Sequence, residues 1–217
     1  MNSPVKMEII LDLCGGTGSW SKPYKDAGYD VRVITLPEYD VCEYQPPDNV
    51  YGILAAPPCD QFSFAKTTGK ARDLKSGLKI MESCLRIIWQ CQLKLVSPYA
   101  KTTSLKFWAL ENPNGLMKRF LGRPVYIFDP WEFGDQYKKN TFLWGWFNPP
   151  IKTYSNKDEV MTQEQIELHK TNSQKLPKFD RLKTKEIHPE MYGKENRKAR
   201  RAITPAGFAK AFFKANP

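Results

Sequence analysis

Short apolar runs alternate with helix-like segments through the first half of the chain. The strand-like runs are EIILDL (8–13), VRVITL (31–36), YGILAA (51–56) and LKFWALE (105–111). A short helix is predicted at 19–28 and a long amphipathic helix at 78–96, where Cys84 and Cys91 share one face. Strands that alternate with helices favour βαβ units, in which parallel strands form a sheet covered by helices on both faces. We therefore expect an α/β fold.

Two further strand-like runs follow, RPVYIFDPWEFG (123–134) and KKNTFLWGWF (138–147). The short connection between them predicts an antiparallel pair, so we expect a mostly parallel sheet with an antiparallel hairpin at one edge. The predicted organisation is a domain at 1–147, a short, basic and irregular segment at 148–201, and a C-terminal helix within 202–217 that packs back on the domain. One helix is predicted inside the basic segment, at about 162–171.

The chain carries 33 Lys and Arg residues against 23 Asp and Glu residues, a formal net charge of +10. This excess favours a polyanionic partner such as nucleic acid, the alternative being a basic soluble protein. No apolar run approaches about 18 residues, and the N-terminus does not have the pattern of a signal peptide, so we expect a cytoplasmic protein with no membrane partner. Five cysteines without a CxxC pair, and two histidines, predict free thiols and no metal site.

Polar or reactive residues follow three of the predicted strands. A glycine turn, GGTG (15–18), follows the first strand, Pro57-Pro58-Cys59 follows the third, and Glu111-Asn112-Pro113 ends the fourth. Ligands of open α/β sheets bind beyond the carboxyl ends of the strands, so these segments would share one rim. Each has a structural alternative: a tight turn without a ligand, a buried thiol, and a capping or salt-bridging carboxylate. The turn is not a dinucleotide fingerprint, because Ser21 stands where its third glycine would be.

The segments DLCGGTGSWS, APPCDQFS and LENPNG, in this order, resemble the cytosine C5-specific DNA methyltransferases. A fourth segment, FGDQYKKNTFLWGWF, resembles a further element of that family, with lysines in place of arginines. The resemblance covers roughly residues 8–147, with one extra residue, Asp60, after the cysteine. It implies a Rossmann-like, class I S-adenosylmethionine-dependent methyltransferase. The chain would be a small form of this family, since only 54 residues (148–201) stand where a full target-recognition domain would lie.

The resemblance assigns roles to individual residues. Cys59 would be the nucleophile that adds to C6 of a flipped-out cytosine, because a thiolate adds readily and leaves readily. Glu111 would bind the N3 and amino edge of the base, and Lys138 or Lys139 would contact its O2 or a phosphate. The resemblance also implies contacts with S-adenosylmethionine, made by Asp12, Leu13, Gly15, Gly16, Thr17, Gly18 and Pro57.

Two acids outside the motifs complete the cofactor contacts that the resemblance implies. Asp40 would contact the adenine amino group. Glu38 is the acid nearest to the place where the family holds the ribose hydroxyls, although that place itself falls near Leu36. Residues 202–205 would pack beside the cofactor. The contacts with DNA would come from Gln61, Ser63, Lys66, Lys70, Arg72 and Asn112.

The leading hypothesis is a minimal DNA cytosine C5 methyltransferase that uses S-adenosylmethionine. Its sequence preference would be short or relaxed, or would come from a partner protein. Two variants of the same chemistry stay open, namely an RNA substrate and the transfer of a modified methyl group. A different class also stays open, a nucleic-acid-binding accessory protein that keeps the fold without turnover. The oligomeric state and the target sequence cannot be deduced from the sequence.

Overall fold

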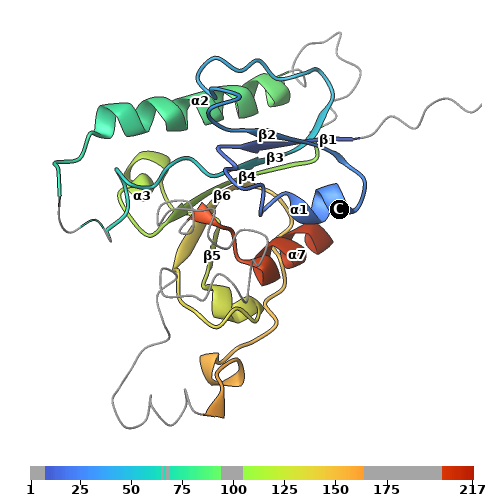
Figure 1. The fold of residues 1–217 in the computed structure, drawn as a ribbon, viewed down its shortest axis with the longest axis vertical. Coiled ribbons are helices and arrows are strands. Elements are labelled where there is room, and N and C mark those ends of the chain that lie inside the picture. Colours follow the sequence, from blue (N-terminus) through green and yellow to red (C-terminus); the bar gives the residue numbers. More distant parts are fainter. Residues whose placement is uncertain (1–7, 65, 67–68, 94–104, 164–201) are drawn as a thin grey trace, which may run out of the picture.

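A computed structural model describes residues 8–64, 66, 69–93, 105–163 and 202–217 (Figure 1). Six strands form one sheet in the order β2-β1-β3-β4-β6-β5. Their bounds are Ile9–Leu13 (β1), Asp30–Ile34 (β2), Val50–Ala55 (β3), Phe107–Pro113 (β4), Tyr126–Phe128 (β5) and Thr141–Trp146 (β6). Strands β1 to β4 pair in parallel, whereas β6 runs antiparallel to both β4 and β5. The predicted mixed α/β sheet with an antiparallel hairpin at one edge is therefore observed.

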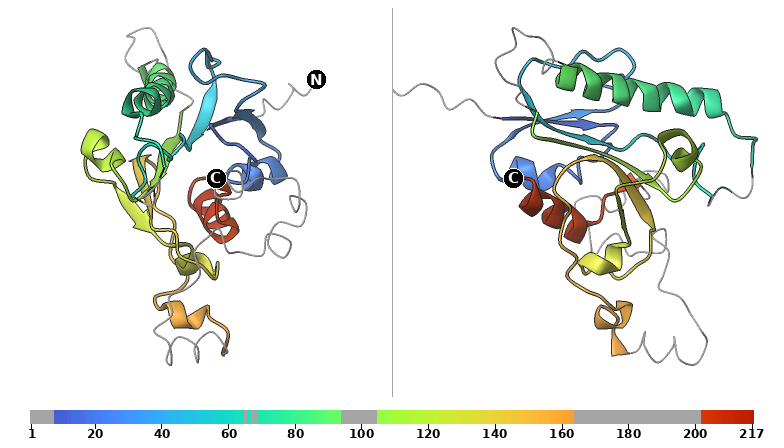
Figure 2. Two further views of the ribbon diagram at one scale, coloured as in Figure 1. Left: turned by 60° about the vertical axis from the view of Figure 1, so that its left-hand side comes forward. Right: turned by 180° about the vertical axis from the view of Figure 1, so that it is seen from behind.

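Helices cover both faces of the sheet. The long helix α2 (Leu74–Leu93) lies across one face, and α1 (Lys22–Asp26) and α7 (Ala206–Ala215) lie on the other (Figures 1 and 2). A short helix, α3 (Met117–Leu121), follows β4. Of two 3-10 turns, η1 (Pro130–Phe133) lies between β5 and β6, and η2 (Lys157–Glu159) follows β6. All five residues of β1 are buried, as expected for a strand covered on both faces.

The two faces have different cores. On the α2 side the core is mainly aliphatic and includes the buried thiols of Cys84 and Cys91, which confirms that the predicted face of this helix packs inward. On the other side aromatic rings dominate, and they include Trp20, Phe107 and Phe208. The rings of Phe128 and Phe208 stack with centroids 3.9 Å apart. This aromatic core fastens α7 to the centre of the sheet.

Two predicted boundaries differ from the structure. Helix α2 begins at Leu74 rather than residue 78, because the carboxylate of Asp73 accepts a hydrogen bond from the amide of Ser76, 3.0 Å away, and so caps the first turn. Helix α1 has five residues, fewer than the ten predicted. All but the first two residues of the helix predicted at 162–171, and most of the basic segment 148–201, lie outside the described residues.

Within the described residues, none of the helices combines the length and the apolar character that a bilayer-spanning segment needs. The same residues contain no cluster of three or more His, Cys, Asp or Glu side chains arranged to hold a metal ion.

Candidate active site

Three segments meet at the edge of the sheet formed by the carboxyl ends of the parallel strands. The first segment is the glycine turn, residues 14–18, which follows β1. The second is the Cys59 loop, residues 57–64, which follows β3. The third is the end of β4, with Glu111 and Asn112. Strands β2 and β3 pair on opposite sides of β1, so the chain reverses its direction of winding at β1. Such a switch point is where open α/β sheets bind ligands.

The backbone of the glycine turn is left-handed at three positions. Cys14, Gly16 and Gly18 have φ angles of 55°, 55° and 68°. Gly15 has a different reason to be glycine, because a Cβ there would lie 2.3 Å from Cγ of Asp12. Gly16 and Thr17 are exposed at the crest of the turn. The backbone of this crest is therefore accessible to a ligand.

Asp12 lies beneath the turn rather than at its surface. Its side chain is fully buried, and Oδ2 accepts a hydrogen bond from Oγ of Ser21, 2.6 Å away. Burial raises the pKa of Asp12 to about 6, although the hydrogen bonds from Ser21 oppose that shift. Among the described residues its other oxygen, Oδ1, has no hydrogen-bond partner. Ser21, where the fingerprint would have its third glycine, thus holds the carboxyl group that shapes the turn.

Further chain segments border the glycine turn. Glu38 and Asp40 follow β2 at the same edge of the sheet and are both exposed. Asp40 accepts a hydrogen bond from the amide of Cys42, 2.8 Å away, which folds its side chain back on its own loop. From the other end of the chain, the amide of Thr204 donates to Oγ of Ser19 over 2.8 Å. Residues near Thr204 therefore do lie beside the turn.

The Cys59 loop is tied to the end of β4. Asn112 is fully buried, and its Nδ2 donates to the carbonyl of Pro57 over 3.0 Å. The thiol of Cys59 is half-buried, and the carbonyl of Cys59 accepts hydrogen bonds from the amides of Phe62 and Ser63. These bonds fix the turn that begins at the cysteine. Asn112, predicted at the nucleic-acid surface, instead lies inside the protein and holds the Pro57 end of this loop.

Several residues expected to contact DNA form hydrogen bonds within the protein, in and around the Cys59 loop. The guanidinium of Arg72 donates to the carbonyls of Gln61, Ser63 and Lys66 over 2.9, 2.9 and 3.1 Å. Oε1 of Gln61 accepts hydrogen bonds from the amide of Asp73 and from Nζ of Lys66. Arg72 and Gln61 therefore connect the Cys59 loop to the start of α2, which differs from their predicted role.

The other residues predicted to contact DNA differ in how far they are buried. Ser63 is buried and forms an isolated β-bridge with Gly115, whereas Lys70 is exposed. The extra residue of the motif, Asp60, is exposed and accepts a hydrogen bond from Nε2 of Gln61, 2.9 Å away. The insertion is thus accommodated at the surface of the loop.

The structure distinguishes the two candidate lysines. Nζ of Lys139 lies 3.6 Å from Oε1 of Glu111, and both side chains are more than four-fifths buried. Lys138 instead acts on Asp129, whose pKa is raised by burial while the charge of Lys138 opposes the shift. Within the described residues, Oε1 of Glu111 accepts no hydrogen bond. A buried carboxylate oxygen beside a lysine can take a hydrogen bond from a donor on a ligand.

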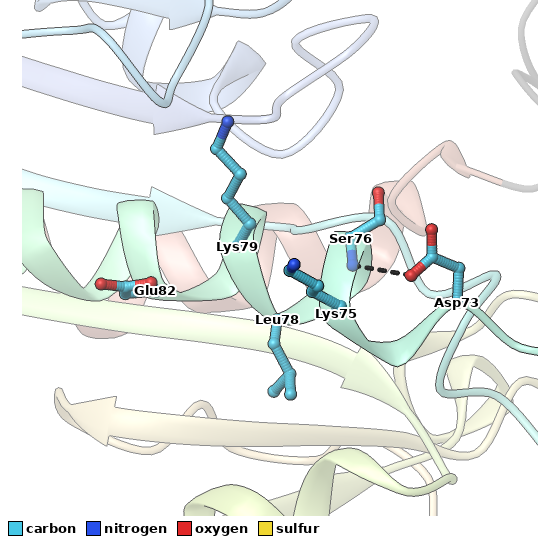
Figure 3. Close-up of a pocket in the computed structure, with 6 residues that line it drawn as sticks. All are labelled: Asp73, Lys75, Ser76, Leu78, Lys79 and Glu82. Carbon is cyan, nitrogen blue, oxygen red and sulfur yellow. Dashed lines mark hydrogen bonds between the residues drawn. The ribbon is translucent and has the colours of Figure 1, made fainter.

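A depression of about 750 Å³ lies elsewhere, along the first turns of α2. Figure 3 shows the residues that line it, Asp73, Lys75, Ser76, Leu78, Lys79 and Glu82. None of them belongs to the predicted site, and the two acids offset the two lysines. This depression therefore does not indicate a binding site for a charged ligand.

Comparison with known proteins gives limited information. No protein-family model and no curated protein matches the sequence. Among 32 matching chains of known structure is one described as a methyltransferase, EhMeth, of Entamoeba histolytica, at 12% identity and a TM-score of 0.38. The match covers 70% of this chain and 58% of that one, so the chain spans little more than half of its length. At these values the likeness assigns neither a family nor an activity.

Proposed function

We propose that this protein is an S-adenosylmethionine-dependent methyltransferase that modifies C5 of cytosine in DNA, with Cys59 as its nucleophile. The observation that carries the proposal is the link from Asn112 to the carbonyl of Pro57. It joins the loop that bears the thiol to the strand end that bears Glu111. The motif residues for nucleophilic addition and base recognition are thus built into one unit, as this chemistry requires.

The residues of the glycine turn fit the proposed cofactor. Gly16 and Thr17 present exposed backbone at the switch point of the sheet, and Glu38 adds an exposed carboxylate at the same edge. Oδ1 of Asp12 is an acceptor without a partner in the described structure. We assign Gly16, Thr17 and Glu38 to cofactor contacts and Asp12 to support of the turn. When bound, S-adenosylmethionine would supply an electrophilic methyl group on a sulfonium to the activated C5.

The protein's own residues would prepare the base. Addition of the Cys59 thiolate to C6 forms a covalent S–C bond and shifts the electron pair of the C5–C6 bond toward C5. Glu111 would hold a proton at N3, which offsets negative charge on the ring, and Lys139 would keep the Glu111 carboxylate in place. Transfer of the C5 proton to water after methylation restores the C5–C6 double bond and expels Cys59 as a thiolate. A target base in duplex DNA must first leave the stack.

The test is covalent capture with labelled S-adenosylmethionine and DNA that contains 5-fluorocytosine, in which the C5 fluorine cannot leave as a proton does. The wild-type protein is expected to form a labelled adduct that survives denaturation. Cys59→Ser should form none, while Cys42→Ser, a change at another half-buried thiol, should form as much as wild type. An adduct that persists in Cys59→Ser would overturn the mechanism.

The substrate is tested separately by mass spectrometry of nucleosides from treated DNA and RNA. We expect 5-methylcytosine in DNA. Its appearance in RNA alone, or a heavier group at C5, would replace the proposed substrate or donor. Failure to bind S-adenosylmethionine in a titration would favour the nucleic-acid-binding accessory protein instead.

A further inference from the structure

A basic surface follows directly after β4. Between Asn114 and Phe128 the sequence has three cations and no acid. The cations, Lys118, Arg119 and Arg123, are all exposed. Phe120 lies among them with 45% of its surface exposed, an unusual place for a large apolar ring.

This surface is fastened to the Cys59 loop. The amide of Leu116 donates to the carbonyl of Phe62 over 2.8 Å, and the amide of Phe64 donates to the carbonyl of Asn114 over 3.3 Å. The two backbones approach so closely that a Cβ on Gly115 would lie 2.3 Å from the carbonyl oxygen of Phe62. Helix α3 and the Cys59 loop are therefore one structural unit.

Cations and rings alternate across this unit. Nζ of Lys118 lies 5.7 Å from the ring centre of Phe64 and 5.9 Å from that of Phe142. Phe64 is 46% exposed, and Phe120 contacts Phe62 edge-on at 6.1 Å. Surfaces that bind unpaired nucleotides combine cations for the phosphates with exposed rings on which bases stack. The depression on α2 differs, because its charges are of both signs.

We propose that Phe64, Lys118, Arg119, Phe120 and Arg123, the α3 patch, bind the DNA strand next to the target cytosine. The cations would contact its phosphates, and Phe64 or Phe120 would stack on a neighbouring base of the same strand that the flipped cytosine leaves without a stacking partner. The proposal rests on the proposed function for the identity of the substrate. Its evidence is separate, namely the charge, the exposed rings and the attachment to the Cys59 loop. Phosphate contacts of this kind give affinity and orientation without sequence readout.

The test is fluorescence anisotropy with labelled single-stranded and duplex DNA over a range of salt concentrations, without cofactor. Lys118→Ala/Arg119→Ala should weaken binding about tenfold or more near 0.1 M salt and lower the slope of log Kd against log salt by roughly 1.4 to 1.8, since each lost phosphate contact removes about 0.7 to 0.9. The matched control is Lys210→Ala/Lys214→Ala, two exposed lysines four residues apart on α7, across the sheet. Its slope should equal that of wild type.

Two further variants keep the test independent of folding. Lys118→Arg/Arg119→Lys retains both charges and should bind like wild type. Phe120→Leu should weaken binding to single-stranded DNA by about tenfold, because a stacked base is lost, and should leave the salt slope unchanged. Equal losses in the α3 and α7 double variants, or no loss in either, would overturn the proposal.

Failure of the α3 patch and failure of the proposed function can be told apart, because DNA binding tests the first and the Cys59 adduct tests the second. Loss of DNA binding in Lys118→Ala/Arg119→Ala, together with no Cys59 adduct in wild type, would support the patch and reject the methyl transfer. Wild-type DNA affinity in that variant, together with a normal adduct, would reject the patch and support the transfer. Tighter binding of an RNA of the same sequence through the same residues would overturn the assignment to DNA.

Discussion

The glycine turn and the Cys59 loop leave neighbouring parallel strands, yet different parts of the chain hold them. The glycine turn is shaped mainly within residues 12–21, through Asp12, Ser21 and three left-handed residues, although the amide of Thr204 also donates to Ser19. The Cys59 loop depends on Asn112 from β4 and on Arg72, which lies two residues before α2, and these are 55 and 11 residues away from their partners Pro57 and Gln61. The first is a local structure, and the second exists only after three elements have packed.

This difference predicts different responses to mutation. Damage to the glycine turn should stay local and affect cofactor binding first. Damage to the contacts of the Cys59 loop should move the thiol and the α3 patch together, and should affect the nucleic-acid side of the site first. Four substitutions test this distinction.

The largest effect is expected from Gly15→Ala. Its methyl group would overlap the Asp12 carboxyl group, which is fully buried and hydrogen-bonded to Ser21. We expect a loss of about 3 kcal/mol in the free energy of unfolding and a large loss of S-adenosylmethionine affinity. Urea denaturation and calorimetric titration measure the two.

Gly16→Ala is the matched control for that change. Beyond its chain neighbours, a Cβ at Gly16 would have no described atom within 4 Å, so only the φ angle of +55° opposes the substitution. We expect a loss of about 1 kcal/mol. Equal losses at the two glycines would show that the contact with Asp12 does not shape the turn.

Asn112→Ala should have the next largest effect. It leaves the carbonyl of Pro57 without its buried donor, which costs about 2 kcal/mol. DNA-dependent adduct formation should fall, while S-adenosylmethionine affinity stays near that of wild type. Urea denaturation, adduct yield and calorimetric titration provide the measurements. Asn114→Ala, a change at an exposed neighbour, should leave all three unchanged, and equal behaviour of the two variants would count against the link.

Arg72→Lys should have a smaller effect. A lysine keeps the charge but lacks the planar fork that reaches three carbonyls, so we expect a loss of about 1 kcal/mol. Amide hydrogen exchange at Phe62 and Ser63 should become faster, since the loop opens more often. Lys70→Ala, at an exposed position nearby, should not change that exchange. Unchanged exchange in Arg72→Lys would show that the hydrogen bonds of Arg72 do not hold the loop closed.

Asp12→Asn should change stability least near pH 4, where Asp12 is protonated, by about 1 kcal/mol or less, because the neutral amide oxygen can still accept from Ser21. The pH dependence should change more. With its pKa raised from 3.8 to about 6, Asp12 holds its proton more tightly in the folded state, so its contribution is present below pH 4 and is lost as pH rises through 6. Urea denaturation at pH 4 to 7 should therefore show the variant gaining stability relative to wild type over this range. A constant difference would contradict the raised pKa.

Sequence reasoning succeeded where the determining contacts are close in the chain. The strands, the antiparallel hairpin and the buried face of α2 follow from apolar periodicity, which is a property of consecutive residues. The start of α2 differs from the predicted residue 78 because apolar periodicity does not include the capping carboxylate of Asp73, although an acid three residues before the amide of Ser76 is itself a start signal.

The side-chain roles around Cys59 could not be obtained in this way. Nothing local distinguishes Arg72, which binds backbone carbonyls of the Cys59 loop, from Lys118, which is exposed, because both lie in basic segments. Likewise, Lys138 and Lys139 are adjacent and identical in the sequence, yet Lys139 pairs with Glu111 whereas the charge of Lys138 acts on Asp129. Such assignments depend on tertiary packing, which brings together residues distant in the chain.

The attachment of α7 has a consequence for synthesis of the chain. Its ring contacts include Trp20, Phe107 and Phe128, and the hydroxyl of Tyr24 donates to the carbonyl of Asn216, 192 residues later. The sheet is complete once residue 146 has left the ribosome, but one aromatic face stays uncovered until residues 206–215 follow. At roughly 5–20 residues per second, that interval lasts several seconds. A nascent chain paused there would expose its rings to solvent and to chaperones.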